Sequence, residues 1–103
     1  MYKFISLPFL LLLSLNHKNP VPVQKEIVEG KIISAINHKP VSNAHVYIVD
    51  GEEEALTNAK GEFRIETIQK FPLIITVDQQ GHEKKKLTLS NPGKITISIT
   101  PKT

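Results

Sequence analysis

The segment LTNAKGEFRI, residues 56–65, carries the clearest local pattern in this sequence. Its first half has the composition of a tight β-turn, because Asn closes turns and Gly61 can adopt a positive φ. Its second half alternates polar and apolar side chains, which is the period of a strand with one buried face. We therefore expect a turn over residues 58–61, followed by a strand whose Phe63 and Ile65 point into a core.

The same two-residue alternation continues from Ile27 to the end of the chain, without any 3.6-residue helical pattern. Gly30 interrupts the first run and predicts a bulge or a close backbone approach. Short runs separated by turn residues predict an all-β, antiparallel β-sandwich of seven strands. The apolar residues expected on buried faces are Ala44, Val46, Ile48, Leu73, Ile75, Val77, Leu87, Leu89, Ile95, Ile97 and Ile99.

The 103 residues are enough for one domain. The N-terminus has the pattern of an export signal, in which Lys3 precedes a short apolar run over residues 4–15. That run is too short for a membrane-spanning helix, which needs about 20 residues. We expect a signal peptide over residues 1–16, with a retained hydrophobic anchor as the alternative, then a proline-containing linker over residues 17–26 and a domain over residues 27–101.

Charge and cysteine content exclude several functions. The chain has 13 Lys and Arg against 10 Asp and Glu. The cleavage site is expected between residues 16 and 25, and cleavage after residue 18 would remove Lys3 and Lys18 and reduce the excess to one. So small an excess gives no support for a nucleic-acid partner, and we expect membrane contact only through an uncleaved N-terminal segment. The absence of cysteine excludes disulfides, thiolate metal sites and a lipid-modified cysteine.

Four motifs, taken in order, resemble the carboxypeptidase regulatory-like domain family. They are VEGKII, KPVSNAHVYI, TNAKGEFRI and LIITVDQQGHE. The positions that match the family pattern are Val28, Gly30, Ile32, Pro40, Val41, Ala44, Val46, Thr57, Gly61, Phe63 and Gly81. Asn43, Asn58 and His82 depart from the usual Gly, Asp and Tyr, but Asn still accepts turn conformations. We take Gly30, Ala44, Gly61, Phe63 and Gly81 as structural markers of the turns and the core.

The resemblance implies a transthyretin-like, Greek-key sandwich and a role in binding rather than a reaction. Members of this family are accessory modules beside peptidases, extensions of outer-membrane nutrient receptors, or stand-alone exported bacterial proteins. The resemblance thus predicts a non-enzymatic module of the bacterial cell envelope, periplasmic, outer-membrane-associated or secreted, that binds a protein or a glycan. An accessory of a nutrient-uptake receptor is one alternative. A transthyretin-like hydrolase is another, although Arg64 is the only arginine and the characteristic C-terminal Tyr-Arg-Gly-Ser is missing.

Candidate chemical groups are few, and no cofactor is expected. The four histidines, His17, His38, His45 and His82, lack the close spacing of a zinc site, and we predict no metal site. We interpret DGEEE, residues 50–54, as a solvated acidic turn rather than a calcium loop, because the EF-hand spacing is absent.

Two further features concern surfaces. We interpret Lys84, Lys85 and Lys86 as protection of an edge strand rather than as an anion site. No serine lies in a nucleophile setting, and we expect no catalytic residues. Tyr47, with His45 beside it on an outward strand face, is the one candidate for ligand binding, because an exposed aromatic ring can stack on a sugar.

Overall fold

The computed structural model describes residues 22–103, in which every regular element is a β-strand. The strands are β1 (Glu26–Ser34), β2 (His45–Val49), β3 (Glu53–Leu56), β4 (Glu62–Thr67), β5 (Leu73–Asp78), β6 (Lys85–Leu89) and β7 (Gly93–Ile99). The predicted signal peptide lies outside the described residues. So do the first five residues of the predicted linker, which include His17. No helix within the described part is long and apolar enough to cross a membrane.

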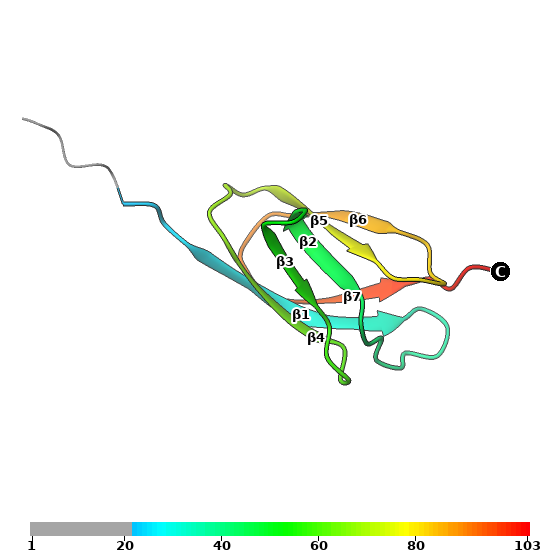
Figure 1. The fold of residues 1–103 in the computed structure, drawn as a ribbon. Coiled ribbons are helices and arrows are strands. Elements are labelled where there is room, and N and C mark those ends of the chain that lie inside the picture. The colour runs from blue at the N-terminus through cyan, green and yellow to red at the C-terminus, as the bar shows by residue number, and fades with distance from the viewer. Residues whose placement is uncertain (1–21) are drawn as a thin grey trace, which may run out of the picture.

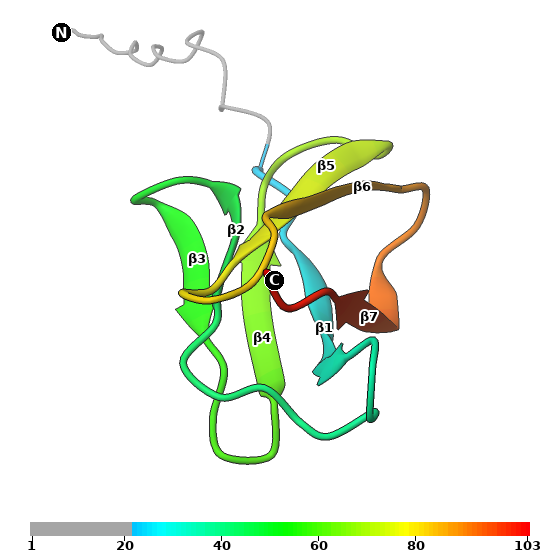
Figure 2. The same cartoon turned by 90° about the vertical axis from the view of Figure 1, so that its right-hand side faces the viewer.

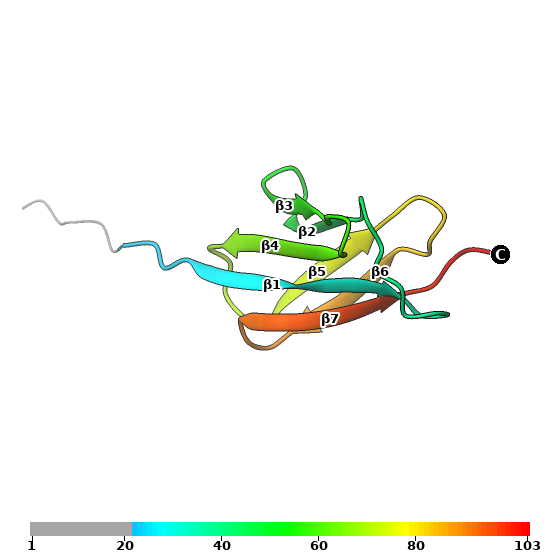
Figure 3. The same cartoon turned by 90° about the horizontal axis from the view of Figure 1, so that it is seen from below.

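The seven strands form two sheets that pack face to face, so the expected all-β sandwich is confirmed. One sheet has the order β4-β1-β7 and the other the order β3-β2-β5-β6. Figure 1 shows both layers, and Figure 3 shows β4, β1 and β7 side by side in the nearer layer. The first and last strands therefore share one sheet, with β1 in its centre.

The expectation of a purely antiparallel sandwich is wrong for one pair, because β1 and β7 run parallel. All other strand pairs are antiparallel. Parallel neighbours need a crossover connection. Here the chain forms β2 and β3 in the four-stranded sheet, returns as β4, and forms β5 and β6 in the four-stranded sheet before it returns again as β7. The alternation of side chains predicts which face is buried, but it contains no information about strand direction.

The core lies between the sheets and consists of aliphatic side chains with one aromatic ring. On β4 the residues alternate strictly between exposed and buried, with Phe63 and Ile65 inside. The other buried apolar residues are Val28, Ile32, Val41, Ala44, Val46, Leu73, Ile75, Val77, Leu89, Ile97 and Ile99. The buried faces of the strands thus follow the two-residue alternation that the sequence indicates.

The turn at residues 58–61 is organised by Asn58. Its side-chain oxygen accepts hydrogen bonds from the backbone N–H groups of Lys60 and Glu62, each at 2.9 Å. The Gly61 N–H donates to the Asn58 carbonyl at 2.9 Å, and Gly61 has a φ of 76°. A Cβ at Gly61 would also lie 2.5 Å from the Ile32 carbonyl oxygen, so this position needs glycine for both reasons.

Candidate functional site

Tyr47 and His45 lie beside each other on the outer face of β2, as the sequence pattern predicts. Their ring centroids are 4.8 Å apart and the planes are tilted by 40°. Both residues are half-buried. In the cross-strand register Tyr47 pairs with Glu54 of β3 and with Thr76 of β5, so its ring lies over the middle of the four-stranded sheet.

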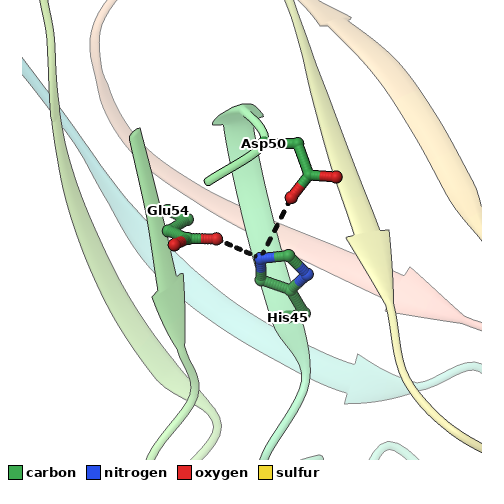
Figure 4. Close-up of side chains that lie close together, drawn as sticks. All are labelled: His45, Asp50 and Glu54. Carbon is green, nitrogen blue, oxygen red and sulfur yellow. Dashed lines mark hydrogen bonds and ion pairs between the residues drawn. The ribbon is translucent and has the colours of Figure 1, made fainter. Parts of the chain in front are cut away.

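Two carboxylates from the DGEEE segment approach the same histidine. His45 Nε2 lies 2.6 Å from Glu54 Oε1 and 3.9 Å from Asp50 Oδ1 (Figure 4). One ligand atom from each of the three residues lies within 4.8 Å of the others. They are the only group of three His, Cys, Asp or Glu side chains close enough to hold an ion among residues 22–103. We call His45, Asp50 and Glu54 the hairpin cluster.

The β2–β3 hairpin positions this cluster. The strand register shifts between Tyr47 and Val49, and the chain then turns through Gly51, whose φ is 82°. A register shift of this kind bends a strand and re-aims its side chains, and here it accompanies the return of Asp50 toward His45. The Gly51 N–H also donates a hydrogen bond to Glu54 Oε1 at 3.2 Å. The Glu54 carboxylate is therefore held by one contact from the turn, at Gly51, and one from the neighbouring strand, at His45.

The interpretation of DGEEE as one solvated turn is only partly right. The turn covers Asp50 to Glu52, whereas Glu53 and Glu54 belong to β3 and point to opposite sides. Glu53 accepts hydrogen bonds from the Thr67 hydroxyl at 2.6 Å and from the Ile68 N–H at 3.0 Å. A strand begins here despite three consecutive glutamates because both β3 carboxylates find partners.

Hydrogen bonding keeps Glu54 ionised. The bond to His45, followed by the bond from the Gly51 N–H, lowers the pKa of the Glu54 carboxyl below its usual range. Because the carboxylate accepts both bonds, the charged form is the one the hairpin stabilises. The cluster therefore presents anionic oxygen atoms next to a ring nitrogen.

The remaining candidate residues do not join this cluster. His38 lies in a turn with a φ of 62°, and His82 contacts the Gln79 side chain at 2.9 Å. Arg64 lies on the other sheet and pairs with Glu66 at 3.4 Å. Arg64 is thus not brought together with His45 in the described part of the chain.

A second surface feature is an open hollow of about 750 Å³ bordered by β1, β3, β4 and β7. Its lining mixes both charge signs with apolar groups, and the charged members are Glu29, Lys31, Glu62, Arg64 and Lys94. Among the described residues, no group of three His, Cys, Asp or Glu side chains in this hollow is close enough to hold an ion. The hollow therefore gives no specific prediction of chemistry.

The free edges of the two sheets differ in character. β3 and β4 lie beside each other and are joined by the Glu53–Thr67 hydrogen bond. β6 is an edge strand and carries Lys85 and Lys86. β7 is a longer edge strand whose only charged residue is Lys94 and which contains no proline. β7 lies beside β1 at the outer side of its sheet (Figure 2). Lysines, prolines and short length protect sheet edges, so β7 is the least protected of the described edge strands.

The edge of β7 offers hydrogen-bonding groups at alternate residues. The Ile99 carbonyl accepts from the Ala35 N–H at 2.8 Å and so faces β1. Backbone groups of successive strand residues point to opposite sides, so those of Thr96 and Ser98 face away from β1. Beyond the strand, the Thr100 carbonyl accepts from the Glu83 N–H at 2.8 Å, so within residues 22–103 the edge is covered at its C-terminal end alone.

Sequence reasoning found Tyr47 and His45 but missed Asp50 and Glu54 as their neighbours. Neither the spacing of the histidines nor the calcium-loop spacing of the acidic run indicates that these side chains meet. The sequence does contain a usable pattern, because pairing two strands across the Asp50-Gly51 turn places Glu54 opposite Tyr47. The register shift after Tyr47, which accompanies the approach of Asp50 to His45, has no comparable sequence pattern.

Seven strands in two packed sheets define this chain as a β-sandwich domain. The chain belongs to the CarboxypepD_reg-like domain family, whose pattern it matches over residues 28–103. No curated protein sequence matches the chain significantly. The family and the sandwich are consistent with a non-catalytic regulatory or interaction domain.

Solved structures with a similar fold include two mutants of the type II cohesin–X-dockerin complex from Acetivibrio cellulolyticus. The N-terminal interface mutant matches with a TM-score of 0.60 and 13% identity, over 74% of this chain and 58% of that chain. The C-terminal interface mutant matches with a TM-score of 0.55 and 17% identity, over 73% and 52% of the two chains. This chain thus spans little more than half of either match, and the low identity makes the likeness one of fold.

Proposed function

We propose that this chain is a non-enzymatic interaction module that binds an extended segment of a partner protein by adding it as a strand beside β7. The observation that carries the proposal is the unprotected β7 edge, with the backbone groups of Thr96 and Ser98 directed outward. An extended peptide would pair with these groups and continue the β4-β1-β7 sheet.

Two further points support a binding role. The family is one of regulatory-like domains, and the fold neighbours come from a cohesin–X-dockerin complex, which is an assembly of proteins. We place the module in the bacterial cell envelope because residues 1–16 have the pattern of an export signal. A receptor for nutrient uptake is one partner that this location would offer.

Peptide selection tests the proposal and does not require the partner protein to be identified first. A library of displayed peptides is selected on the purified protein, and a selected peptide is then titrated into the isotope-labelled chain. Strand addition predicts that the backbone amide resonances of Thr96 and Ser98 shift and become protected from hydrogen exchange. Thr96→Pro removes one outward N–H without removing a bond to β1, and should weaken binding at least tenfold.

Thr88→Pro, on the lysine-bearing edge strand β6, is the matched control and should leave peptide affinity unchanged if its fold is intact. One-dimensional spectra establish that both variants are folded. If selected peptides shift the amides around Tyr47 and leave Thr96 and Ser98 unaffected, the binding surface is the outer sheet face and the β7 proposal is wrong.

A glycan bound over Tyr47 is the second candidate function. The observation that favours it is the arrangement of a half-buried aromatic ring with His45 and Glu54 beside it, since sugars pack on rings and bond to flanking polar groups. A glycan array probed with the wild-type chain and with Tyr47→Ala tests it. Binding that is equal for both proteins, or absent for both, would reject Tyr47 as a sugar platform.

A further inference from the structure

We propose that the hairpin cluster of His45, Asp50 and Glu54 is a binding site for a divalent transition-metal ion, with Zn²⁺ as the best fit. The proposal is independent of the proposed function, because the cluster lies on the outer face of the four-stranded sheet and β7 lies in the other sheet. All three ligands come from one hairpin, so the site needs no partner chain to assemble.

The geometry of the cluster fits an ion with small side-chain adjustments. Zinc binds histidine nitrogen and carboxylate oxygen at about 2.0–2.2 Å, so ligands of a tetrahedral site lie roughly 3.3 Å from one another. Here His45 Nε2 lies 2.6 Å from the Glu54 oxygen and 3.9 Å from the Asp50 oxygen, and all three ligand atoms lie within 4.8 Å of each other. These separations fall on both sides of the ideal value.

Hydrogen bonding alone leaves this arrangement incomplete. A neutral imidazole has at most one proton on Nε2 and can donate it to only one acceptor, which here is Glu54. Asp50 faces the same nitrogen at 3.9 Å, beyond hydrogen-bonding distance, and the two carboxylates repel each other. A divalent cation would interact favourably with all three groups at once.

The hairpin holds the ligands before an ion arrives. The Gly51 N–H fixes Glu54 Oε1 at 3.2 Å, and the Tyr47 ring packs against the imidazole with a centroid separation of 4.8 Å. Such outer contacts orient ligands and raise metal affinity.

The ligand types select the class of ion. Imidazole nitrogen suits Zn²⁺ and its neighbours, whereas Ca²⁺ and Mg²⁺ prefer sites built of oxygen alone. Three protein ligands leave a position open in a tetrahedral shell, and the exposure of Asp50 and Glu54 makes that position accessible to water or to a ligand.

Calorimetric titration of the purified chain with ZnCl₂ at pH 7.5 tests the proposal, together with nitrogen-15 spectra of the histidine side chains. We expect saturable binding of one ion per chain and a large shift of the His45 Nε2 resonance. His45→Gln, Asp50→Asn and Glu54→Gln should each weaken binding at least tenfold. Excess Ca²⁺ should not displace the ion, because Ca²⁺ prefers sites built of oxygen alone.

His38→Gln and His82→Gln are the matched controls, because both histidines lie outside the cluster, and they should leave zinc affinity unchanged. The cluster side chains are partly or fully exposed, so their variants should keep the wild-type amide spectrum. Two results would overturn the proposal. One is the absence of saturable zinc binding up to millimolar concentration, which would leave the cluster as an ion pair. The other is zinc binding that survives His45→Gln.

Discussion

Thr57 joins separate segments of the chain through a single buried hydroxyl group. The hydroxyl donates to the Val41 carbonyl at 2.7 Å and accepts from the Ala44 N–H at 2.9 Å. The backbone of Thr57 adds reciprocal bonds with Asn43 and Ala44, each at 3.0 Å. Asn43, whose N–H donates one of these bonds, has a φ of 57°, a conformation that asparagine tolerates better than most residues. The threonine of the LTNAKGEFRI segment therefore fixes the entry to β2.

Thr57→Val should destabilise the fold by at least about 2 kcal/mol, because it leaves two buried backbone groups without partners at roughly 1–3 kcal/mol each. Thr57→Ser keeps the hydroxyl and loses one methyl group, which costs about 1 kcal/mol. Urea unfolding of the two variants and the wild type measures both effects. Equal losses for valine and serine would mean that the hydroxyl bonds contribute nothing to stability.

Phe63→Ala should lower the free energy of unfolding by about 3–5 kcal/mol, as for other buried phenylalanines. Phe63 is 6% exposed and is the only aromatic side chain among the buried core residues of the described part of the chain. Ile74→Ala is the control, because Ile74 is 56% exposed on β5 and should change stability by about 0.5 kcal/mol or less. Matching thermal transitions for Phe63→Ala and the wild type would contradict the strand register of β4.

Gly30 acts at the scale of the strand pair, because it lets β1 and β7 approach each other. A Cβ at this position would collide with the Ile95 carbonyl oxygen, which belongs to the backbone of β7 and cannot move aside alone. From the sequence, Gly30 predicts either a bulge in the strand or a close approach of a neighbouring backbone. The continuous β1–β4 register through Gly30 and the contact with Ile95 agree with close approach.

Gly30→Ala should therefore displace β7 and cost about 1–3 kcal/mol, in the range of overpacked sites. The amide resonances of Ile95 and its neighbours on β7 should shift more than those of β4. Glu29→Ala, at the adjacent position of β1, supplies the control and should be nearly neutral. Unfolding curves give the energies, and amide spectra locate the displacement. A Gly30→Ala protein with unchanged β7 resonances would contradict the close-approach explanation.

For the molecule as a whole, the sequence predicts the number of strands and their buried faces, because a period of two is a local property. It does not predict that β1 and β7 run parallel, since this depends on how the intervening strands are distributed between the sheets. The same limit applies to the hairpin cluster. Tyr47 and His45 share a strand face and are predictable, whereas the approach of Asp50 depends on the register shift after Tyr47.

Hydrogen exchange across the molecule tests the arrangement on which the β7 proposal depends. β1 has a neighbour on each side, so its amides should exchange most slowly in the three-stranded sheet. Along β7 we expect alternation, with slow exchange at Ile97, whose N–H faces β1, and fast exchange at Thr96 and Ser98, whose N–H groups face solvent.

The alternation is the informative result, because a frayed strand would exchange fast at every residue and a covered edge would exchange slowly at every residue. Measurement at two protein concentrations separates the last case from self-association, in which protection of Thr96 and Ser98 would grow with concentration. Protection of both residues in the dilute chain would mean that something within the molecule already covers the edge. Strand addition at β7 would then require that cover to leave first, and peptide binding should be slow and independent of peptide concentration at saturation.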